Sequence, residues 1–598
     1  MPAGVLTAML LAATANAGGP ATPATVRVQA RDAWVAPVGP ESAGARNVWV
    51  YFSDKGVPAA ELAASLRQLE QSSDPHMVAR RRLRRTEPGL FDARDLPVCG
   101  TYLDQIRARG ASVHVTSRWL NAASVRATAA QREQIAANPH VVRIEPVRAG
   151  RRHEPLPAEN PAVPAPQSAA PRGAPLEGIA FSQQNQIGLP ALHAAGFTGQ
   201  GVRIGILDTG FKRTHAAFNQ PGHGLCVIAE HDFVFNDGNT TNEPDDDPNQ
   251  HNHGSYVLGL IGAYQPTVYT GGAFDACFIL CKTEDIRSET PIEEDNYVAG
   301  LEFIEMHGGD IATASLGYID WYTQADLDGQ TAVTTVAVNV ATANGLICFN
   351  AAGNEGHDAD PGTSSIIAPA DAHEVLTIGA VDSAGDIAGF SSDGPTADGR
   401  IKPEVLARGV NNDIIRVGND TDFTNGSGTS FATPLAAAAG ACLLQAHPTW
   451  SVSQMRAYLC ATASDYVASG AHDPVFVRGF GIIAAAAAVM QDCNANGIDD
   501  AAEIASGQVA DCNADGVPDP CEVALGPLAF FSADADQNGV PDECPMCPAD
   551  YNHDGVVTSQ DFFNFIADFF SASADFNHDG STTSQDFFDF LGAFFTPC

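Results

Sequence analysis

Three side chains of the types used in nucleophilic catalysis stand in short, distinctive segments of the chain. Asp208 ends the apolar run VRIGILD and is followed by Thr-Gly. His253 opens the segment HGSYVLGLIGA, and Ser430 lies between a Gly-rich turn and an Ala-rich run in GSGTSFATPLAAAAG. A serine hydroxyl needs an adjacent base, which His supplies near neutral pH, and a buried carboxylate fixes the tautomer of that His. The pattern therefore predicts hydrolysis through an Asp-His-Ser triad.

The elements that must position these residues alternate between strands and helices. VRIGILD, LICFNAAG and VLTIGAV have the apolar character of buried strands, and a long helix is predicted from Ser430 onward. Such alternation is typical of a parallel sheet flanked by helices. We therefore expect an α/β domain over residues 176–490, preceded by a small α+β domain at 47–150. The Pro- and Ala-rich residues 151–175 are expected to form a linker.

The three segments, in the order Asp, His, Ser, resemble the signatures of the subtilisin-like (subtilase) serine proteases. These signatures read DTG, HGS-x-V-x-G and GTS-x-A-x-P in this chain. Two further matches are NAAGNEG, which contains Gly353 and Asn354, and SLG at Ser315, Leu316 and Gly317. His251 is an alternative base, but only His253 is followed by the Gly-Ser of the motif.

The resemblance implies a role for each matched residue. Ser430 would attack the scissile carbonyl, His253 would carry the proton, and Asp208 would orient the imidazole. The Asn354 amide and the Ser430 backbone N–H would hold the oxyanion. The segment from Ser315 to Gly317 and Gly353 would pair with the substrate backbone and form the wall of the first specificity pocket. Protein or peptide substrates follow from these roles.

The N-terminal part carries a charge opposite to that of the rest. Residues 1–153 hold 20 basic and 12 acidic side chains, whereas the whole chain has a net charge of −39. The resemblance implies that residues 47–150 are an inhibitory propeptide, docked partly by charge. Cleavage is expected between about residues 148 and 175. The run RRRLRR at 80–85 is compatible with a processing site or a solvated surface.

Export is indicated by two features of the sequence. Residues 1–17 resemble a signal peptide, with an apolar segment before Ala15-Asn16-Ala17. Of 13 cysteines, Cys99 lies in the propeptide region, and two blocks of six follow, at 226–460 and 493–598. Even numbers suit disulfides in an oxidising compartment, although buried free thiols are the alternative for several of them. We expect a secreted or extracellular protein, with attachment to the cell surface as an option.

The C-terminus contains an internal repeat with the pattern of calcium loops. Residues 550–570 and 575–595 are identical at 14 of 21 positions. Each copy places Asp, Asn and Asp at loop positions 1, 3 and 5, Gly at position 6 and Asp at position 12. The following Phe residues predict one apolar helix face, formed in the first copy by Phe562, Phe565, Ile566, Phe569 and Phe570.

A paired loop and helix of this kind resembles a dockerin, which implies Ca²⁺ and a possible cohesin-like partner for residues 546–598. The partner would face Ser559-Gln560 and Ser584-Gln585, and Cys547 and Cys598 would close the ends. The implied Ca²⁺ ligands are Asp550, Asn552, Asp554, Asp561, Asp575, Asn577, Asp579 and Asp586.

Residues 491–545 contain three looser acidic loops with cysteines, which resemble thrombospondin type 3 repeats. The resemblance implies Ca²⁺-loaded, Cys-bridged spacers, with a flexible acidic linker as the alternative. The acidic run from Glu243 to Asp247 is a further candidate for Ca²⁺, with a solvated loop as the alternative.

Composition excludes two classes of function. The acidic balance argues against a nucleic-acid binder, because phosphate contacts need a surplus of Lys and Arg. No apolar run approaches the roughly 20 residues that span a bilayer, so no transmembrane segment is predicted. The sequence thus favours a secreted, Ca²⁺-binding serine endopeptidase. The alternatives are an exopeptidase and a calcium-binding surface or adhesive protein with an inactive subtilase scaffold.

Overall fold

The computed structural model describes residues 25–27, 34–35, 44–147, 175–287 and 292–595. Short gaps fall in the last range at 495, 530, 535–539, 543, 545–548, 550, 552–556, 572 and 578–580. The expected signal peptide and most of the expected linker lie outside these residues.

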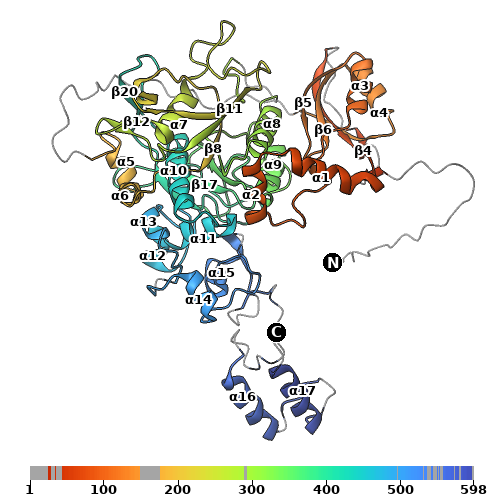
Figure 1. The fold of residues 1–598 in the computed structure, drawn as a ribbon, viewed down its shortest axis with the longest axis vertical. Coiled ribbons are helices and arrows are strands. Elements are labelled where there is room, and N and C mark those ends of the chain that lie inside the picture. The colour runs from red at the N-terminus through yellow and green to blue at the C-terminus, as the bar shows by residue number, and fades with distance from the viewer. Residues whose placement is uncertain are drawn as a thin grey trace, which may run out of the picture.

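A seven-stranded parallel sheet forms the centre of the largest domain (Figure 1). The strand order is β11-β14-β8-β15-β16-β17-β18, and every neighbouring pair is parallel. This confirms the predicted α/β class. The strands are β8 (Arg203–Asp208), β11 (Cys226–Asp232), β14 (Cys277–Lys282), β15 (Ile311–Ala314), β16 (Ile347–Ala351), β17 (Leu376–Val381) and β18 (Val405–Arg408).

Helices cover both faces of the sheet, which is why its strands are apolar on both sides. On one face, α7 (Asn252–Gly262) and α10 (Thr429–Ala446) pack in a core that includes Ile204 and Ile206. On the other, α8 (Ile292–Met306) and α9 (Val333–Ala343) pack in a core that includes Leu207. The interior strand β8 therefore lies between two helical layers.

Shorter elements complete this domain. They are α5 (Phe181–Asn185), α6 (Leu189–Ala194), α11 (Val452–Ala461), α12 (Ser464–Ser469), α13 (Ala485–Ala488), β9 (Asn219–Gln220), β10 (His223–Gly224), β12 (Tyr264–Gln265), β13 (Tyr269–Thr270), β19 (Asn412–Ile415) and β20 (Phe423–Gly426). Within the described residues, α10 alone has the length and composition of a membrane span, and 89% of it is buried inside the domain.

The N-terminal domain is the expected α+β unit. Its five-stranded sheet has the order β2-β7-β3-β6-β5, and α3 (Gly100–Ala108) and α4 (Ala129–Ala136) accompany it. The strands are β2 (Trp34–Val35), β3 (Arg46–Phe52), β5 (Ser112–Ser117), β6 (Ala122–Ala127) and β7 (Val141–Pro146), and β1 (Thr25–Arg27) pairs with β4 (Asp54–Pro58).

The second face of this sheet rests on α8 (Figure 1). Trp49, Tyr51 and Trp119 belong to the same apolar cluster as the α8 residues Tyr297 and Leu301. Polar contacts also cross the boundary. The Ser117 hydroxyl donates to Glu302 at 2.5 Å, and Ser124 donates to Asp295. The N-terminal domain is thus docked on the peptidase-like domain.

Two helices that the sequence reasoning missed connect β4 to the rest of the N-terminal domain. They are α1 (Leu62–Ser72) and α2 (Pro75–Arg84), and α2 contains most of RRRLRR. The reading of this run as a solvated surface is wrong for Arg80, Arg81 and Arg84, which are buried, whereas Arg82 and Leu83 are exposed. The charges of the three buried arginines are balanced by buried carboxylates, which sequence alone did not connect to them.

The segment after residue 490 is not a free spacer over its described part. Two short helices, α14 (Asp500–Ser506) and α15 (Asp519–Leu525), follow the first two acidic loops. Val517, Cys521 and Phe531 belong to the main core cluster of the peptidase-like domain. The Arg456 guanidinium donates to the Ala529 carbonyl at 2.7 Å. This segment therefore packs on α11.

The cysteines pair only in part as expected. Among the described residues, disulfides join Cys226–Cys277, Cys493–Cys521 and Cys512–Cys544. Cys281, Cys348, Cys442 and Cys460 are buried free thiols, so the even number in the central block was misleading. Cys547 and Cys598 lie outside the described residues.

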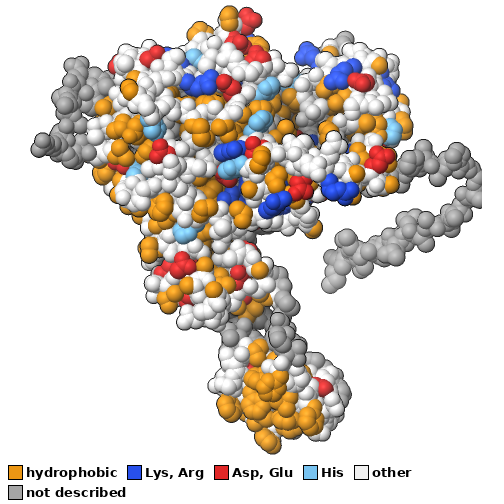
Figure 2. Space-filling model, viewed as in Figure 1, with side chains coloured by type: hydrophobic (Ala, Val, Ile, Leu, Met, Phe, Trp, Pro, Cys, Tyr) orange, Lys and Arg blue, Asp and Glu red, His pale blue; other side chains and the backbone are white. Residues whose placement is uncertain are grey.

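The last two helices, α16 (Ser559–Phe570) and α17 (Ser584–Phe594), pair as the repeat predicted. Their centre is a stacked pair of buried rings, Phe565 and Phe590, with centroids 4.1 Å apart. Phe570, predicted on the same face, is 82% exposed. It is rotated by roughly 80° from Phe562 at 3.6 residues per turn. Figure 2 shows hydrophobic side chains covering the visible face of this unit.

Candidate active site

Three elements bring the candidate catalytic residues to one edge of the large sheet. Asp208 is the last residue of β8, an interior strand of the sheet. His253 is in the first turn of α7, and Ser430 is in the first turn of α10. The carboxyl ends of parallel strands share one edge, where ligand sites of open α/β sheets lie. The predicted triad residues, 222 positions apart in the sequence from Asp208 to Ser430, thus meet in space.

Glycine allows α7 to approach β8 closely. A Cβ added at Gly254 would lie 2.3 Å from the carbonyl oxygen of Gly210 and 3.0 Å from Cβ of Asp208. The backbone N–H of Gly254 also donates to Thr209 Oγ1 at 3.2 Å. The Gly that follows the catalytic His in the motif is therefore a steric requirement, because α7 touches the backbone of the strand turn there.

A short hydrogen bond joins the histidine to the aspartate. His253 Nδ1 lies 2.7 Å from Asp208 Oδ1, and the Asp208 side chain is fully buried. The same carboxylate oxygen accepts the Thr209 N–H at 2.7 Å. This geometry fixes the proton on Nδ1 and leaves Nε2 as the basic nitrogen.

The Ser430 hydroxyl has its hydrogen-bond acceptor on Ser315. It donates to the Ser315 carbonyl at 3.2 Å, and the Ser315 hydroxyl donates to the Ser430 carbonyl at 2.9 Å. The rings of His253 and Phe431, the residue after Ser430, have centroids 6.1 Å apart. Among the described residues no hydrogen bond joins Ser430 to His253. Such bonds often tighten only when substrate binds.

Asn354 is held next to the first turn of α10. Its Oδ1 accepts from the backbone N–H of Thr429 at 2.8 Å and from the Thr429 hydroxyl at 3.0 Å. A Cβ added at Gly428 would lie 3.8 Å from Asn354 Nδ2 and 3.7 Å from the Ser430 backbone nitrogen. Both candidate oxyanion donors therefore border the same small space, which the missing side chain at Gly428 leaves open.

The expected substrate-binding residues also come together. Ser315, Leu316 and Gly317 directly follow β15, and the next residue, Tyr318, pairs with Ala368 through two backbone hydrogen bonds. Added Cβ atoms at Gly317 and Gly353 would lie 2.3 and 3.2 Å from atoms of one side chain, Ile367. These residues form a common wall beside the candidate nucleophile.

His251 is not placed to act as the base. Its Nδ1 accepts from the backbone N–H of Asn242 at 3.1 Å, and Asn242 directly precedes the acidic run 243–247. Burial, together with the charge of Lys212, lowers the pKa of His251 to about 4. His251 is therefore neutral at physiological pH, and of the two histidines only His253 bonds to the Asp208 carboxylate.

Sequence reasoning missed Gln250, which is fully buried and lies three residues before His253. Its amide nitrogen donates to the carbonyls of Thr209 and Glu284 at 2.7 and 2.5 Å, and its oxygen accepts from Ile286. Gln250 thereby ties the ends of β8 and β14 to the turn that carries His253. Nothing in the local sequence marks this role, because all three partners are distant backbone groups.

A lysine of β14, Lys282, binds an aspartate of the acidic loop before His253. The Lys282 ammonium is buried and lies 2.8 Å from oxygens of both Asp232 and Asp246. The expected Ca²⁺ site at Glu243–Asp247 is therefore not supported around Asp246. Oxygens of Asp232, Asp237 and Glu243 lie close enough together to share a cation.

The calcium ligands expected at the C-terminus are described only in part. Asp561 and Asp586 are buried, and each accepts the backbone N–H of a capping threonine at 2.7 Å, Thr558 and Thr583 respectively. Asp575 and Asn577 are described, whereas Asp550, Asn552, Asp554 and Asp579 lie outside the described residues. The described part of this region is helical.

Comparison with known proteins agrees with this geometry. The model of the subtilase family matches residues 199–482, and that of a peptidase S8 propeptide domain from Bacteroidota matches residues 47–159. Subtilisin from Bacillus pumilus is 32% identical over 300 residues, which cover 50% of this chain and 94% of that relative. Subtilisin E from Bacillus subtilis is 32% identical over 281 residues, 47% of this chain and 65% of that relative.

Among solved structures, this chain resembles fervidolysin from Fervidobacterium pennivorans, a keratinolytic enzyme related to subtilisin. The TM-score is 0.52 at 19% identity, covering 78% of this chain and 64% of that one. The fold and the site define a serine hydrolase with the active-site edge at the carboxyl ends of a parallel sheet. The chain belongs to the subtilase family and is a subtilisin-like serine peptidase with a propeptide domain.

We predict that Gly254→Ala abolishes most activity, because the new methyl group must displace α7 and His253 from Asp208. Hydrolysis of a chromogenic peptide should fall at least about a hundredfold, since small misplacements of a catalytic group cost that much. Gly389→Ala is the matched control, because an added Cβ there meets nothing within 4 Å. Equal activity of the two variants would contradict the steric argument.

Proposed function

We propose that this protein is a secreted serine endopeptidase that uses Asp208, His253 and Ser430. The observation that carries the proposal is the 2.7 Å bond between His253 Nδ1 and buried Asp208. Ser430 is in the first turn of α10, and the ring of the next residue, Phe431, has its centroid 6.1 Å from that of His253. This arrangement leaves His253 Nε2 basic and places the Ser430 backbone N–H at a helix start.

The chemistry follows from these positions. Ser430 Oγ attacks the scissile carbonyl carbon while its proton passes to Nε2 of His253. Asp208 stabilises the imidazolium that forms, and the Asn354 amide and the Ser430 N–H hold the oxyanion. His253 then protonates the leaving amine. Water deacylates Ser430 by the same route, so that the enzyme is regenerated.

The substrate would bind as an extended strand along Ser315, Leu316 and Gly317. Gly317 and Gly353 both lie against Ile367, so there is no room for a side chain at either position. This close packing supports their assignment to the wall of the pocket. A substrate backbone placed there would present its carbonyl to the space between Asn354 and Ser430. The residue types at the wall are compatible with protein and peptide substrates.

The N-terminal domain at 47–150 would be the propeptide of the same chain. Its sheet already lies on α8, and its last described residue, Val147, precedes the expected cleavage region. Glu302 and Asp295 of α8 accept hydrogen bonds from serines of the propeptide sheet. Arg118 of the propeptide also forms ion pairs with Glu302 and Glu305 of α8, and these pairs support docking partly by charge. Cleavage between about 148 and 175 would separate the two domains.

We further propose that the C-terminal unit is a Ca²⁺-dependent attachment module of dockerin type, with a cohesin-like partner. The repeated helices α16 and α17 support this reading, because their packing preserves the internal symmetry. Ser559, Gln560, Ser584 and Gln585 are exposed at equivalent positions of the two helices. In residues 491–545, buried Asp500, Glu503, Asp519 and Glu522 support cation binding by thrombospondin type 3-like loops.

The first test is self-processing of the full chain. We expect the wild-type protein to lose about 150 residues on expression, whereas Ser430→Ala keeps them, because the hydroxyl is the proposed nucleophile. Intact-mass spectrometry measures both products. If neither chain is shortened and neither cleaves casein, the alternative of an inactive scaffold in an adhesive calcium-binding protein is favoured. Internal fragments of a long peptide distinguish an endopeptidase from an exopeptidase.

Asn354→Ala should lower kcat by about 10²–10³ with little change in KM, because the lost donor acts on charge that develops only in the transition state. Steady-state kinetics on a peptide anilide measure both constants. A change confined to KM would instead mean that Asn354 binds the ground-state substrate.

Replacement of the Asp561 and Asp586 carboxylates by amides tests the calcium module. In the full chain carrying Ser430→Ala, the double change Asp561→Asn and Asp586→Asn should release about two Ca²⁺ ions per molecule, because each loop loses a charged ligand. Calorimetric titration after dialysis against a chelator measures the stoichiometry. Asp568→Asn, on the same helix α16, is the control and should bind as the parent does. An unchanged stoichiometry in the double variant would disprove the ligand assignment.

A further inference from the structure

The helix α2 contacts the peptidase domain far from the substrate cleft. It lies beside the start of β8 and the loop before β15, where Asp310 accepts the backbone N–H of Arg203 at 3.1 Å. Asp208, at the other end of β8, marks the opposite edge of the sheet. Figure 1 shows α1 and α2 running from the propeptide sheet along the peptidase domain to α9. This contact therefore cannot block the active site directly.

Two arginines of α2 are buried against one carboxylate of the peptidase domain. Arg80 forms an ion pair with Glu305 and also donates to the Gly309 carbonyl. Arg81 Nε donates to the same Glu305 at 2.8 Å, and its two terminal nitrogens bind Asp95 of the propeptide. All of these side chains are almost completely buried, so water does not weaken the attraction.

A third arginine, Arg84, reaches a second part of the peptidase domain. Its Nη1 pairs with Asp310 at 3.1 Å, and its other nitrogens donate to the carbonyls of Trp450 and Pro448, both at 2.7 Å. His76, at the start of α2, contacts Asp310 from the other side at 2.8 Å. The helix thus spans α8 and the turn between α10 and α11.

The peptidase surface is shaped for this helix. A Cβ added at Gly345 would lie 2.4 Å from the Cβ of Arg84, and one added at Gly308 would lie 2.8 Å from Asp74 and 3.1 Å from His76. The Thr86 N–H donates to the Ala343 carbonyl at the end of α9 at 3.0 Å. Two glycines of the peptidase domain therefore stand where any side chain would push α2 away.

Glu305 also links this contact to the propeptide sheet, because Arg118 pairs with its other oxygen. Burial opposes the charge of Glu305, but the three arginines hold its pKa at about 2. The carboxylate is therefore ionised whenever the propeptide is docked. Within the described part of the chain, every ion-pair partner of Glu305 belongs to the propeptide.

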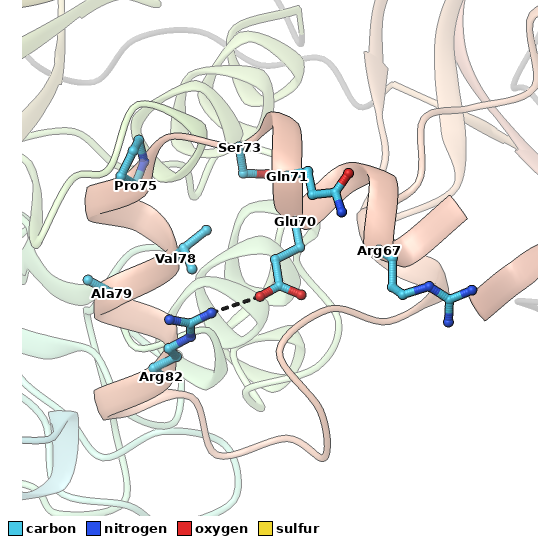
Figure 3. Close-up of a pocket in the computed structure, with 8 residues that line it drawn as sticks. All are labelled: Arg67, Glu70, Gln71, Ser73, Pro75, Val78, Ala79 and Arg82. Carbon is cyan, nitrogen blue, oxygen red and sulfur yellow. Dashed lines mark hydrogen bonds and ion pairs between the residues drawn. The ribbon is translucent and has the colours of Figure 1, made fainter. Parts of the chain in front are cut away.

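Arg82, on the outward face of α2, serves as a control for the buried arginines. Figure 3 shows that Arg82 points into the groove between α1 and α2, where its guanidinium binds Glu70 at 2.8 Å. The groove has a volume of about 490 Å³ and is lined by residues of these two helices. The Arg82 side chain is 64% exposed and contacts no peptidase residue through an ion pair.

We propose that α2 is a dedicated anchor that keeps the propeptide bound to the peptidase domain after the linker has been cut. The anchor binds a surface separate from the substrate cleft, formed around Glu305, Asp310 and the carbonyl groups of Gly309, Pro448 and Trp450. It rests on the proposed role of residues 47–150 as a propeptide that is cleaved from the rest. Release of the propeptide then requires loss of the α2 contact as well as cleavage of the linker.

The experiment uses the full chain with Ser430→Ala, so that no self-cleavage interferes. A recognition sequence for a site-specific protease, inserted within residues 153–174, allows the linker to be cut at will. The rate at which the propeptide leaves the immobilised peptidase part is then measured. We expect slow release from the parent and release at least about a hundredfold faster after Arg80→Ala combined with Arg84→Ala, because breaking buried ion pairs has an effect of this size. Arg82→Ala should release at the parental rate.

Glu305→Gln tests the same contact from the peptidase side and leaves the propeptide sequence unchanged, so misfolding of α2 cannot explain its effect. It should also speed release. The proposal is overturned if the parent loses its propeptide as soon as the linker is cut, or if the arginine variants and Glu305→Gln release no faster than Arg82→Ala. Activity plays no part in this readout, so a failure here is distinct from failure of Ser430 to process the wild-type chain.

Discussion

The active site depends on one close contact, the approach of α7 to the end of β8. At Gly254 the helix backbone touches the turn after Asp208, with no room for a side chain. This contact brings the His253 ring to 2.7 Å from the buried carboxylate. Because β8 is an interior strand of the sheet and both its faces are covered, the carboxylate is fully buried. The position of α10, and with it Ser430, is set by packing on the same face.

Charge organises the rest of the molecule around this centre. Arg80, Arg81 and Arg84 of the propeptide do not form a solvated surface but are buried against carboxylates near the end of α8 and before β15. Buried charges are tolerated only with partners, and each of these three arginines has at least one carboxylate partner in the peptidase domain. The same rule explains Lys282, which neutralises the two aspartates near the active-site turn.

The C-terminal part is stabilised by different interactions. Its acidic loops contain few apolar residues, and its first portion gains stability by packing on α11 of the peptidase domain and from disulfides. The last two helices form a small core of their own from repeated phenylalanines. Phe570 is exposed although spacing predicts it on the apolar face of α16. It follows Phe569 directly, and one residue along a helix rotates the side chain by about 100°.

Local motifs and hydrophobic patterns were enough to predict the fold class, the candidate catalytic residues, an N-terminal α+β domain and the repeat of α16 and α17. The first strand of the N-terminal sheet, β2 (Trp34–Val35), lies before the predicted start of that domain at residue 47. The burial of the arginines in RRRLRR, the partners of Lys282, the contribution of Gln250 and the docking of the segment after residue 490 became visible only in the tertiary structure. Each of these depends on contacts between residues distant in sequence. No local pattern encodes such contacts, since the partner groups are backbone carbonyls or carboxylates brought together by the packing of whole elements.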